Sequence, residues 1–112
     1  QLKGHEGSVN SAHFSRNGKF IVTAGADKTA RIWDFSGKQL EILRGHEGSV
    51  RSANFSPDGQ LIVTASFDGT ARVWDNSGKE LVSLKGHKGK LFSANFSPDG
   101  QRIVTAGVDG VR

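Results

Sequence analysis

Two stretches of the sequence decide the fold: RIWDFSGKQLEILRGHEGSV at residues 31–50 and RVWDNSGKELVSLKGHKGKL at residues 72–91. Each contains a Trp-Asp pair and, eleven residues after its Asp, begins a Gly-His pair. Gly-His also occurs at residues 4–5, so that successive pairs are 41 residues apart. Residues 4–44 and 45–85 align without a gap and are identical at 26 of 41 positions. The 112-residue chain is therefore predicted to be one unit (1–112) built of repeats 4–44, 45–85 and a truncated third, 86–112.

Within one repeat, short apolar runs alternate with turn signals. The sequence SPDG at residues 56–59 places proline second in a tight turn and glycine where a positive φ closes it. Asp68-Gly69 is a two-residue hairpin signal. No segment shows a helical period of 3.6 over a useful length. Each repeat therefore predicts four β-strands, which in the second repeat are Val50–Phe55, Leu61–Ala65, Thr70–Trp74 and Glu80–Leu84.

The second strand of each repeat carries apolar or small residues on both faces. Side chains alternate along a strand, so Ile62 and Thr64 point one way while Val63 and Ala65 point the other. A sheet with one wet face alternates apolar and polar residues instead. We therefore expect each four-stranded sheet to be covered on both faces by neighbouring repeats.

These linked motifs resemble a known family. A period near 40, Gly-His upstream, SPDG in the first turn, Asp in the next turn and a closing Trp-Asp resemble the WD40 repeat, over the whole chain. The resemblance implies an all-β fold, a β-propeller whose four-stranded antiparallel blades surround a central channel. With two full repeats and a partial third that lacks its Trp-Asp, we expect an incomplete ring within one chain. Either further blades of a larger propeller or identical chains would complete it.

The resemblance also implies a hydrogen-bonded tetrad in each blade: Trp of the third strand, Ser or Thr of the second, His of Gly-His and Asp of the hairpin. Such a chain is coherent because indole only donates, carboxylate only accepts, and hydroxyl and neutral imidazole do both. Thr, His and Asp also look like a catalytic triad, but this set recurs, so we predict a structural role and no catalytic residue. Mapped by motif, the sets are His5, Thr23, Asp27, Trp33; His46, Thr64, Asp68, Trp74; and His87, Thr105, Asp109.

A partner-contacting rim is a further implication of the family. It lies beside the apolar residue that opens the first strand and just before the tetrad Asp. Arg and aromatic residues are enriched in binding hot spots, and cations pack on aromatic rings, so we predict an acidic or aromatic-bearing peptide as partner. The alternative is that Phe67 and Phe92 only pack against the neighbouring repeat. The predicted rim residues are Asn10, Arg51, Phe67, Lys90, Phe92 and Val108.

The composition excludes several classes of site. The chain has no cysteine, which removes disulfides, thiolate nucleophiles and thiolate metal ligands. His13 stands where the other repeats have Asn54 and Asn95, and without a second unique histidine or a carboxylate cluster we expect neither a metal nor another cofactor. No apolar run is long enough to span a membrane and no secretory signal is visible, so we expect no membrane partner and a cytoplasmic location.

The charge pattern narrows the choice of partner. The net charge of +4 is modest, and basic residues are scattered among acidic ones. Arg31 and Arg72 recur at equivalent positions, and without interleaved stacking aromatics we expect them to be solvated and not part of a nucleic-acid track. Our leading hypothesis is a non-enzymatic scaffold or docking module for a protein or peptide. The alternatives are a channel-based enzyme, an anion- or nucleic-acid-binding propeller, and a self-assembling propeller fragment with no dedicated ligand.

Overall fold

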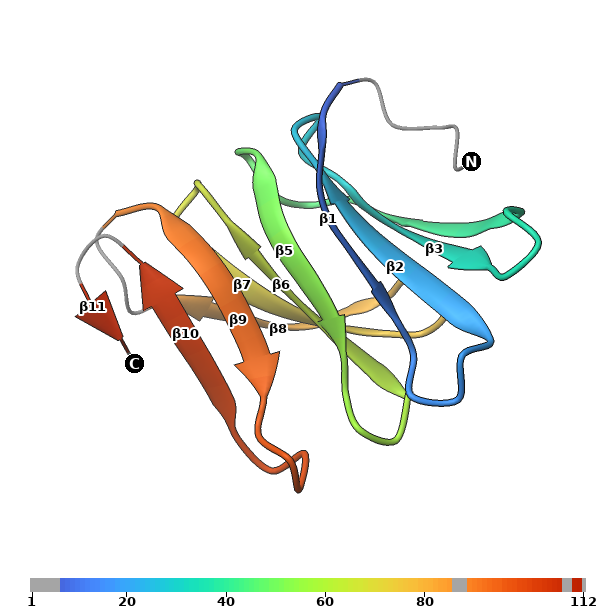
Figure 1. Cartoon of the computed structure of the whole chain (residues 1–112). Helices are drawn as coiled ribbons and strands as arrows, with labels where there is room; N and C mark the ends of the chain where they lie inside the picture. Colours follow the sequence, from blue (N-terminus) through green and yellow to red (C-terminus); the bar gives the residue numbers. More distant parts are fainter. Residues whose placement is uncertain (1–6, 86–88, 108–109, 112) are drawn as a thin grey trace.

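The computed structural model describes residues 7–85, 89–107 and 110–111 of the chain (Figure 1). Within those ranges every regular element is a β-strand. They contain no helix that could span a membrane. The strands of the first repeat are β1 (Val9–Phe14), β2 (Phe20–Gly25), β3 (Ala30–Asp34) and β4 (Gln39–Leu43). Those of the second are β5 (Val50–Phe55), β6 (Leu61–Ser66), β7 (Thr70–Asp75) and β8 (Glu80–Lys85). The third contributes β9 (Leu91–Phe96), β10 (Ile103–Gly107) and β11 (Gly110–Val111).

The strands form antiparallel sheets of consecutive strands. The sheet orders are β1-β2-β3-β4, β5-β6-β7-β8 and β11-β10-β9. This confirms the predicted all-β fold of WD40-type blades. In the second repeat the first predicted strand has the observed bounds, and each of the other three ends one residue later, at Ser66, Asp75 and Lys85.

The first turn of the second repeat forms as its residue types predict. The Ser56 carbonyl accepts a hydrogen bond from the Gly59 N–H at 2.9 Å, and Gly59 has a φ of 76°. The Ser56 hydroxyl accepts from the Leu61 N–H at 3.0 Å and donates to the Asp58 carboxylate at 2.6 Å. The turn therefore fixes where β5 ends and β6 begins.

Neighbouring sheets pack face to face through two apolar cores. Ile62 lies in the core shared with the first sheet, beside Val22 and Ile32. Val63, the next residue along β6, lies in the core shared with the third sheet, beside Leu91. Both β6 side chains are fully buried. The expectation that repeats cover both faces of the middle sheet is confirmed.

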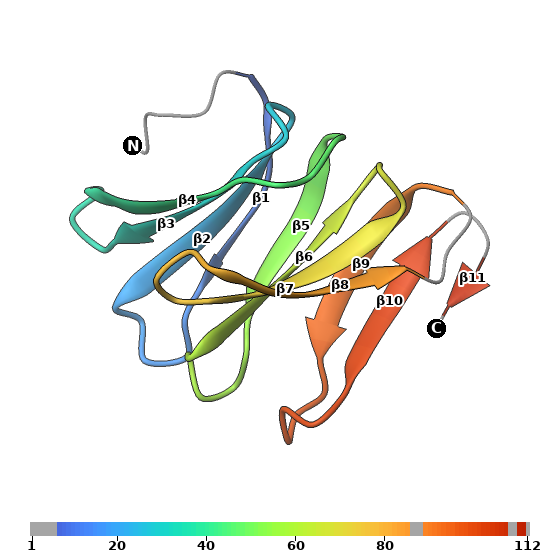
Figure 2. The same ribbon diagram turned by 180° about the vertical axis from the view of Figure 1, so that it is seen from behind.

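The inner strands β1, β5 and β9 lie side by side and run in the same direction, while β4 and β8 lie on the far side (Figures 1 and 2). Polar side chains link these inner edges: the Asn54 amide donates to the Ala94 carbonyl at 2.9 Å, and the Ala94 N–H donates to the Ser52 hydroxyl at 3.2 Å. The strand starts therefore gather on one rim and the strand ends on the opposite rim. The described blades form an arc that does not close into a ring.

Candidate functional site

Three predicted rim residues sit on β-bulges at the starts of the inner strands. The pairing register shifts between Val9 and Ser11, between Val50 and Ser52, and across the equivalent part of β9. No residue of the neighbouring strand pairs with Asn10, Arg51 or Phe92. A bulge adds one residue to a strand and changes the direction of its side chain, and bulges are frequent next to functional sites. The repeat thus presents one variable side chain per blade at the same rim.

Phe67 lies at the centre of this rim, in the hairpin between β6 and β7. The Arg51 guanidinium carbon is 5.3 Å from the centre of the Phe67 ring, and the Lys90 ammonium nitrogen is 4.6 Å from it. The Phe92 ring meets Phe67 edge to face, with 5.8 Å between ring centres. We refer to Arg51, Phe67, Lys90 and Phe92 as the Phe67 cluster. It joins residues of the second and third repeats.

Asn10 extends the rim to the first repeat, but its side chain is largely used within the chain. Its amide donates to the Ser49 hydroxyl at 3.0 Å and to the Val50 carbonyl at 2.8 Å. The Arg51 guanidinium donates to the Asn10 carbonyl oxygen at 3.4 Å. Asn10 therefore holds Arg51 in place. Val108, the sixth predicted rim residue, lies outside the described residues.

The Phe67 cluster has unbalanced positive charge. Within the described parts of the chain, neither Arg51 nor Lys90 has a carboxylate within ion-pair distance. The Nε–H of Arg51 is buried and has no hydrogen-bond acceptor among the described residues. Phe67 is half-buried against the third blade, whereas Phe92 is 45% exposed. The two rings thus pack between repeats and still leave an aromatic surface open to solvent.

The residues predicted as the second tetrad form one continuous hydrogen-bonded chain. The Trp74 indole donates to the Thr64 hydroxyl at 2.9 Å. Thr64 is 2.6 Å from Nε2 of His46, and Nδ1 of His46 is 2.9 Å from the Asp68 carboxylate. Because an ionised carboxylate only accepts, Nδ1 carries the proton and Nε2 accepts from Thr64. Every polar atom along this chain is satisfied in one tautomer of the imidazole.

The environment of this tetrad shifts two pKa values in the same direction. Burial lowers the pKa of His46, although the hydrogen bond and the negative charge of Asp68 act against it. For Asp68, burial is the largest effect and raises the pKa. The hydrogen bonds from Thr70, the Glu47 N–H and His46 together outweigh burial and hold the pKa of Asp68 well below its usual range. The neutral imidazole and the ionised carboxylate are therefore the stable pair.

The other two tetrads lie partly outside the described residues. In the first repeat the Trp33 indole donates to the Thr23 hydroxyl at 2.9 Å, as Trp74 does to Thr64. Asp27 accepts from the Thr29 hydroxyl at 2.7 Å, and its predicted partner His5 lies outside the described residues. In the third repeat Thr105 is buried, while His87 and Asp109 lie outside those residues.

Two recurring residue types in this network were missed or misread from the sequence. Thr70 donates to Asp68 at 2.7 Å and lies 3.3 Å from Nδ1 of His46, so it supports the tetrad. The expectation that Arg31 and Arg72 are solvated is wrong. Arg31 is 8% exposed and pairs with Asp27 at 3.2 Å, and Arg72 bonds to Glu80 at 2.8 Å. Their recurrence with an Asp four residues earlier in each repeat was the available signal.

His13 is exposed on β1. No group of three or more His, Cys, Asp or Glu side chains able to hold a metal ion occurs among the described residues.

Comparison with known proteins identifies the repeat. The family model described as "WD domain, G-beta repeat" matches residues 1–34, 37–75 and 78–111. The chain belongs to the WD40 repeat family. WD40 repeats generally form scaffolds that bind proteins or peptides, and the family is generally non-enzymatic.

Curated WD40 relatives match single stretches of the chain. Nuclear distribution protein PAC1 of Candida albicans is 49% identical over 37 residues, which is 33% of this chain and 8% of that protein. Transducin beta-like protein 2 of Mus musculus is 47% identical over 32 residues, 29% of this chain and 7% of that protein. Periodic tryptophan protein 2 homolog of Neurospora crassa is 52% identical over 33 residues, 30% of this chain and 4% of that protein. The chain spans less than a tenth of the length of these relatives.

Proposed function

We propose that this chain is a non-enzymatic docking module whose Phe67 cluster binds a protein or peptide partner. The observation that carries the proposal is the placement of two unpaired cations on one aromatic ring, 4.6 and 5.3 Å from its centre. Arg and aromatic residues dominate binding hot spots because they combine a large contact area with directional polar contacts. The WD40 family supports the general function, and the rim geometry supports this location for it.

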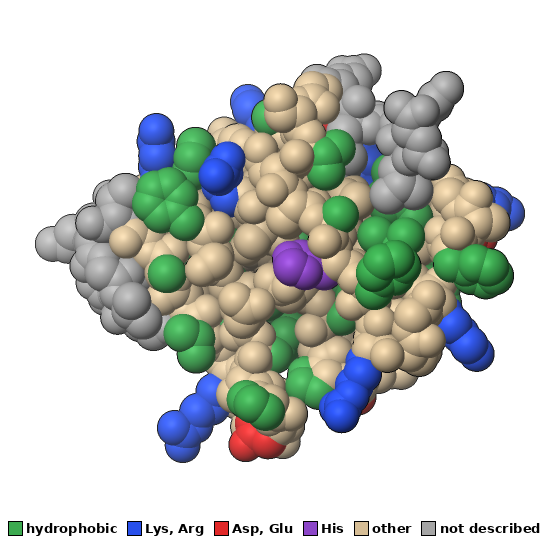
Figure 3. Space-filling model, viewed as in Figure 1, with side chains coloured by type: hydrophobic (Ala, Val, Ile, Leu, Met, Phe, Trp, Pro, Cys, Tyr) green, Lys and Arg blue, Asp and Glu red, His purple; other side chains and the backbone are tan. Residues whose placement is uncertain are grey.

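The chemistry of the cluster favours an acidic partner segment that also carries an aromatic side chain. The partner's carboxylate would neutralise Arg51 and Lys90, whose mutual repulsion no described carboxylate relieves. A partner ring would pack on the open side of Phe92. Figure 3 supports the charge argument, since Lys and Arg side chains surround the face seen there and few Asp or Glu side chains appear on it.

The burial of the tetrad supports a non-enzymatic role. If the tetrad acted as a catalytic triad of the Ser-His-Asp type, Thr64 would be the nucleophile. Its side chain is fully buried, however, and its hydroxyl already contacts Trp74 and His46. A nucleophile must reach its substrate. The Trp33–Thr23 bond repeats the same arrangement one blade away, which a single active site would not require. We expect the parent chain not to hydrolyse chromogenic ester substrates, so that the Thr64→Ser and His46→Gln variants give the same background rate as the parent.

The docking site is tested by comparing how tightly the chain binds two peptides of opposite charge. A fluorescent peptide with alternating Glu and Phe should bind saturably, and a peptide with Lys in place of Glu should not. Arg51→Ala should weaken binding by at least about fivefold, the effect of removing one hot spot. Arg102→Ala, an exposed arginine at the opposite end of the blades, is the matched control and should bind normally. Equal binding of both peptides, or an equal effect of both variants, would contradict the proposal.

Nucleic acid is the alternative ligand for a basic surface. Binding to DNA or RNA releases counterions, so its affinity falls steeply with salt. We expect a labelled 20-nucleotide single strand to bind the parent chain weakly at 0.15 M salt. The Arg51→Ala variant should bind this strand with the same affinity. Strong, salt-sensitive binding of that strand by the Phe67 cluster would favour this alternative.

We also propose that further WD40 blades, of the same or of identical chains, cover the two outermost faces. Val9 is 48% exposed, whereas its counterparts Val50 and Leu91 are 0% and 1% exposed in the internal interfaces. At the other end Val104 is 49% exposed, whereas its counterpart Val63 is fully buried. These faces are two halves of the same repeated interface. Light scattering separates the two sources, since identical chains would give a discrete oligomer.

A cytoplasmic location stays a prediction.

A further inference from the structure

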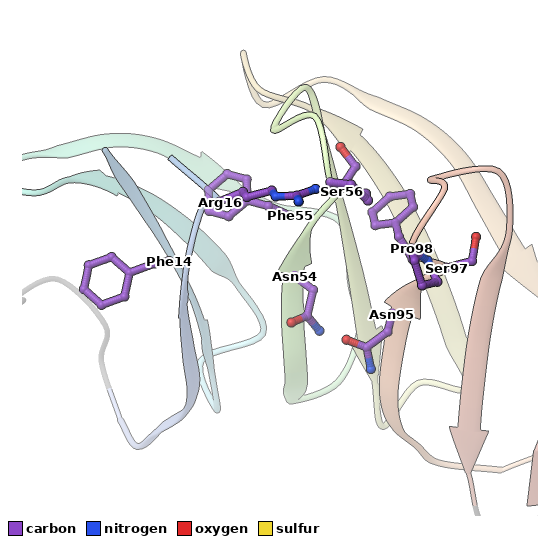
Figure 4. Close-up of a pocket in the computed structure, with 10 residues that line it drawn as sticks. Phe14, Arg16, Asn54, Phe55, Ser56, Asn95, Ser97 and Pro98 are labelled. Carbon is purple, nitrogen blue, oxygen red and sulfur yellow. The ribbon is translucent and has the colours of Figure 1, made fainter. Parts of the chain in front are cut away.

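A hollow lies at the ends of the inner strands opposite the Phe67 cluster. Each inner strand ends in phenylalanine, four residues beyond its bulged rim residue: Phe14, Phe55 and Phe96. At about 3.3 Å per residue this separates the two places by about 13 Å. The hollow has a volume of about 360 Å³ and is open to solvent (Figure 4). It is therefore a surface distinct from the proposed rim.

Equivalent residues of all three repeats line this hollow, so its wall repeats with the blades. The Phe55 and Phe96 rings pack partly against the two inter-sheet cores and alternate with Pro57 and Pro98, each two residues further along its own repeat. The Phe14 ring lies on the other side of β1, away from Arg16 and Phe55 (Figure 4). Phe14 is 67% exposed, and Phe55 and Phe96 are half-buried. Face-to-face sheets stack about 10 Å apart, so apolar patches recur along the wall at about that interval.

One residue breaks the repetition. Where the second and third repeats have proline, the first has Arg16. Arg16 is exposed, and it forms no ion pair within the described parts of the chain. The hollow therefore has a cation at its first-repeat end only, which gives it a direction.

Hydrogen-bond donors also face the hollow. The Asn54 amide is used to bridge β5 to the Ala94 carbonyl of β9. Asn95, its counterpart one blade further on, is exposed, and its amide forms no hydrogen bond with a described residue. The Asn95 amide and the Arg16 guanidinium are thus available to carbonyl groups of a ligand.

We propose that this hollow binds a proline-rich peptide segment in the polyproline II conformation, with an acidic residue at its Arg16 end. Such a helix has three residues per turn and rises about 3.1 Å per residue, or about 9 Å per turn, close to the interval between blades. Proline at every third position would place one ring beside Phe55 and the next beside Phe96. Its backbone carbonyls have no internal hydrogen bonds and need donors, as in other aromatic-lined grooves for this conformation.

An amphipathic α-helix is the competing occupant. Residues seven apart on a helix are about 10.5 Å apart, so the interval alone does not exclude it. The carbonyls of a helix, however, are already bonded within the helix, so the Asn95 amide would gain no partner from them. The free donors favour the polyproline II segment.

Fluorescence anisotropy with three labelled peptides tests the choice of ligand on the full 112-residue chain. The first has proline at every third position and a Glu beyond one end, the second has the same composition scrambled, and the third is a helical peptide with leucine at every seventh position. The first should bind saturably and at least about tenfold more tightly than the other two, the ratio expected when binding depends on one matched set of hot spots. Absence of saturable binding, or tighter binding of the scrambled or helical peptide, would overturn the proposal.

Variants of the hollow locate the binding. Arg16→Ala and Asn95→Ala should each weaken binding of the first peptide by at least about fivefold, because each removes one anchor. Arg44→Ala changes an exposed arginine at the opposite ends of the strands and serves as the matched control. Arg51→Ala at the rim should also leave binding unchanged, which keeps this result independent of the Phe67 cluster. Thermal unfolding confirms that each variant is folded, and binding that depends on Arg51 instead of Arg16 would refute the site.

Discussion

At the residue scale, the chain depends on the buried, hydrogen-bonded side chains of the second tetrad. The Trp74, Thr64, His46 and Asp68 contacts could be predicted because four residue types recurred at fixed spacing and matched a family pattern. The contribution of Thr70 was not predicted, because a threonine in a strand is compatible with solvent exposure. For Arg72 the one signal in the sequence was the Asp four residues earlier in both full repeats. Only the geometry of the hairpin shows that both side chains turn back onto Asp68.

Removing the tetrad carboxylate should be costly. Asp68→Ala leaves the His46 Nδ1–H and the Glu47 and Thr70 N–H groups without their acceptor, so we expect a loss of about 2–4 kcal/mol in the free energy of unfolding. Asp58→Ala is the matched control in an exposed turn and should cost about 1 kcal/mol or less. Urea denaturation measures both, and equal losses would contradict a special role for Asp68.

Acid should destabilise the chain in two stages. The pKa of His46 is lowered from 6.5 in the folded state, so the unfolded state binds more protons below that pH. Stability from His46 is therefore full above about pH 6.5 and falls by up to about 1.4 kcal/mol per pH unit below it. The pKa of Asp68 is lowered from 3.8, which adds a second loss below about pH 4. Urea midpoints from pH 3 to 8 test this, and a flat profile of the parent chain between pH 5 and 7 would contradict it.

At the element scale, the four strands of the second repeat could be predicted to within one residue because tight turns mark where each strand must stop. The β-bulges at Asn10, Arg51 and Phe92 could not be predicted. A bulge is a mismatch between two strands, and neither strand alone carries a residue type that requires it here. The direction of the rim side chains was for this reason inferred from the family and not from local sequence.

Equivalent side chains in different sheets should differ in energetic weight. Val63 is fully buried between the second and third sheets, whereas Val104, 41 residues later, is 49% exposed. Val63→Ala should cost about 2 kcal/mol, from two lost methyl groups and a residual cavity. Val104→Ala should change stability by about 0.5 kcal/mol or less. Urea denaturation of both variants tests the stacking, and a similar cost at both positions would show that β6 is not covered on both faces.

At the scale of the whole molecule, the period of 41 residues is enough to predict stacked blades, because each sheet needs apolar cover on both faces. It does not predict which side chains meet across blades. The contact of Lys90 and Arg51 with one ring, and the use of Asn10 as a cross-blade clamp, depend on the angle between successive sheets. The sequence therefore named the candidate rim residues, while the contacts among them came from the structure.

The central claim is that residues 41 apart occupy the same place in successive blades, and the two tryptophans test it most directly. An amide-exchange series of ¹H–¹⁵N NMR spectra would follow their two indole N–H signals. Both indoles are 1% exposed and donate to a threonine hydroxyl at 2.9 Å, so both signals should exchange slowly. Thr64→Val should shift and speed the exchange of the Trp74 signal alone, and Thr23→Val that of the Trp33 signal alone. Rapid exchange of either indole in the parent chain, or indifference of both signals to these substitutions, would contradict the account.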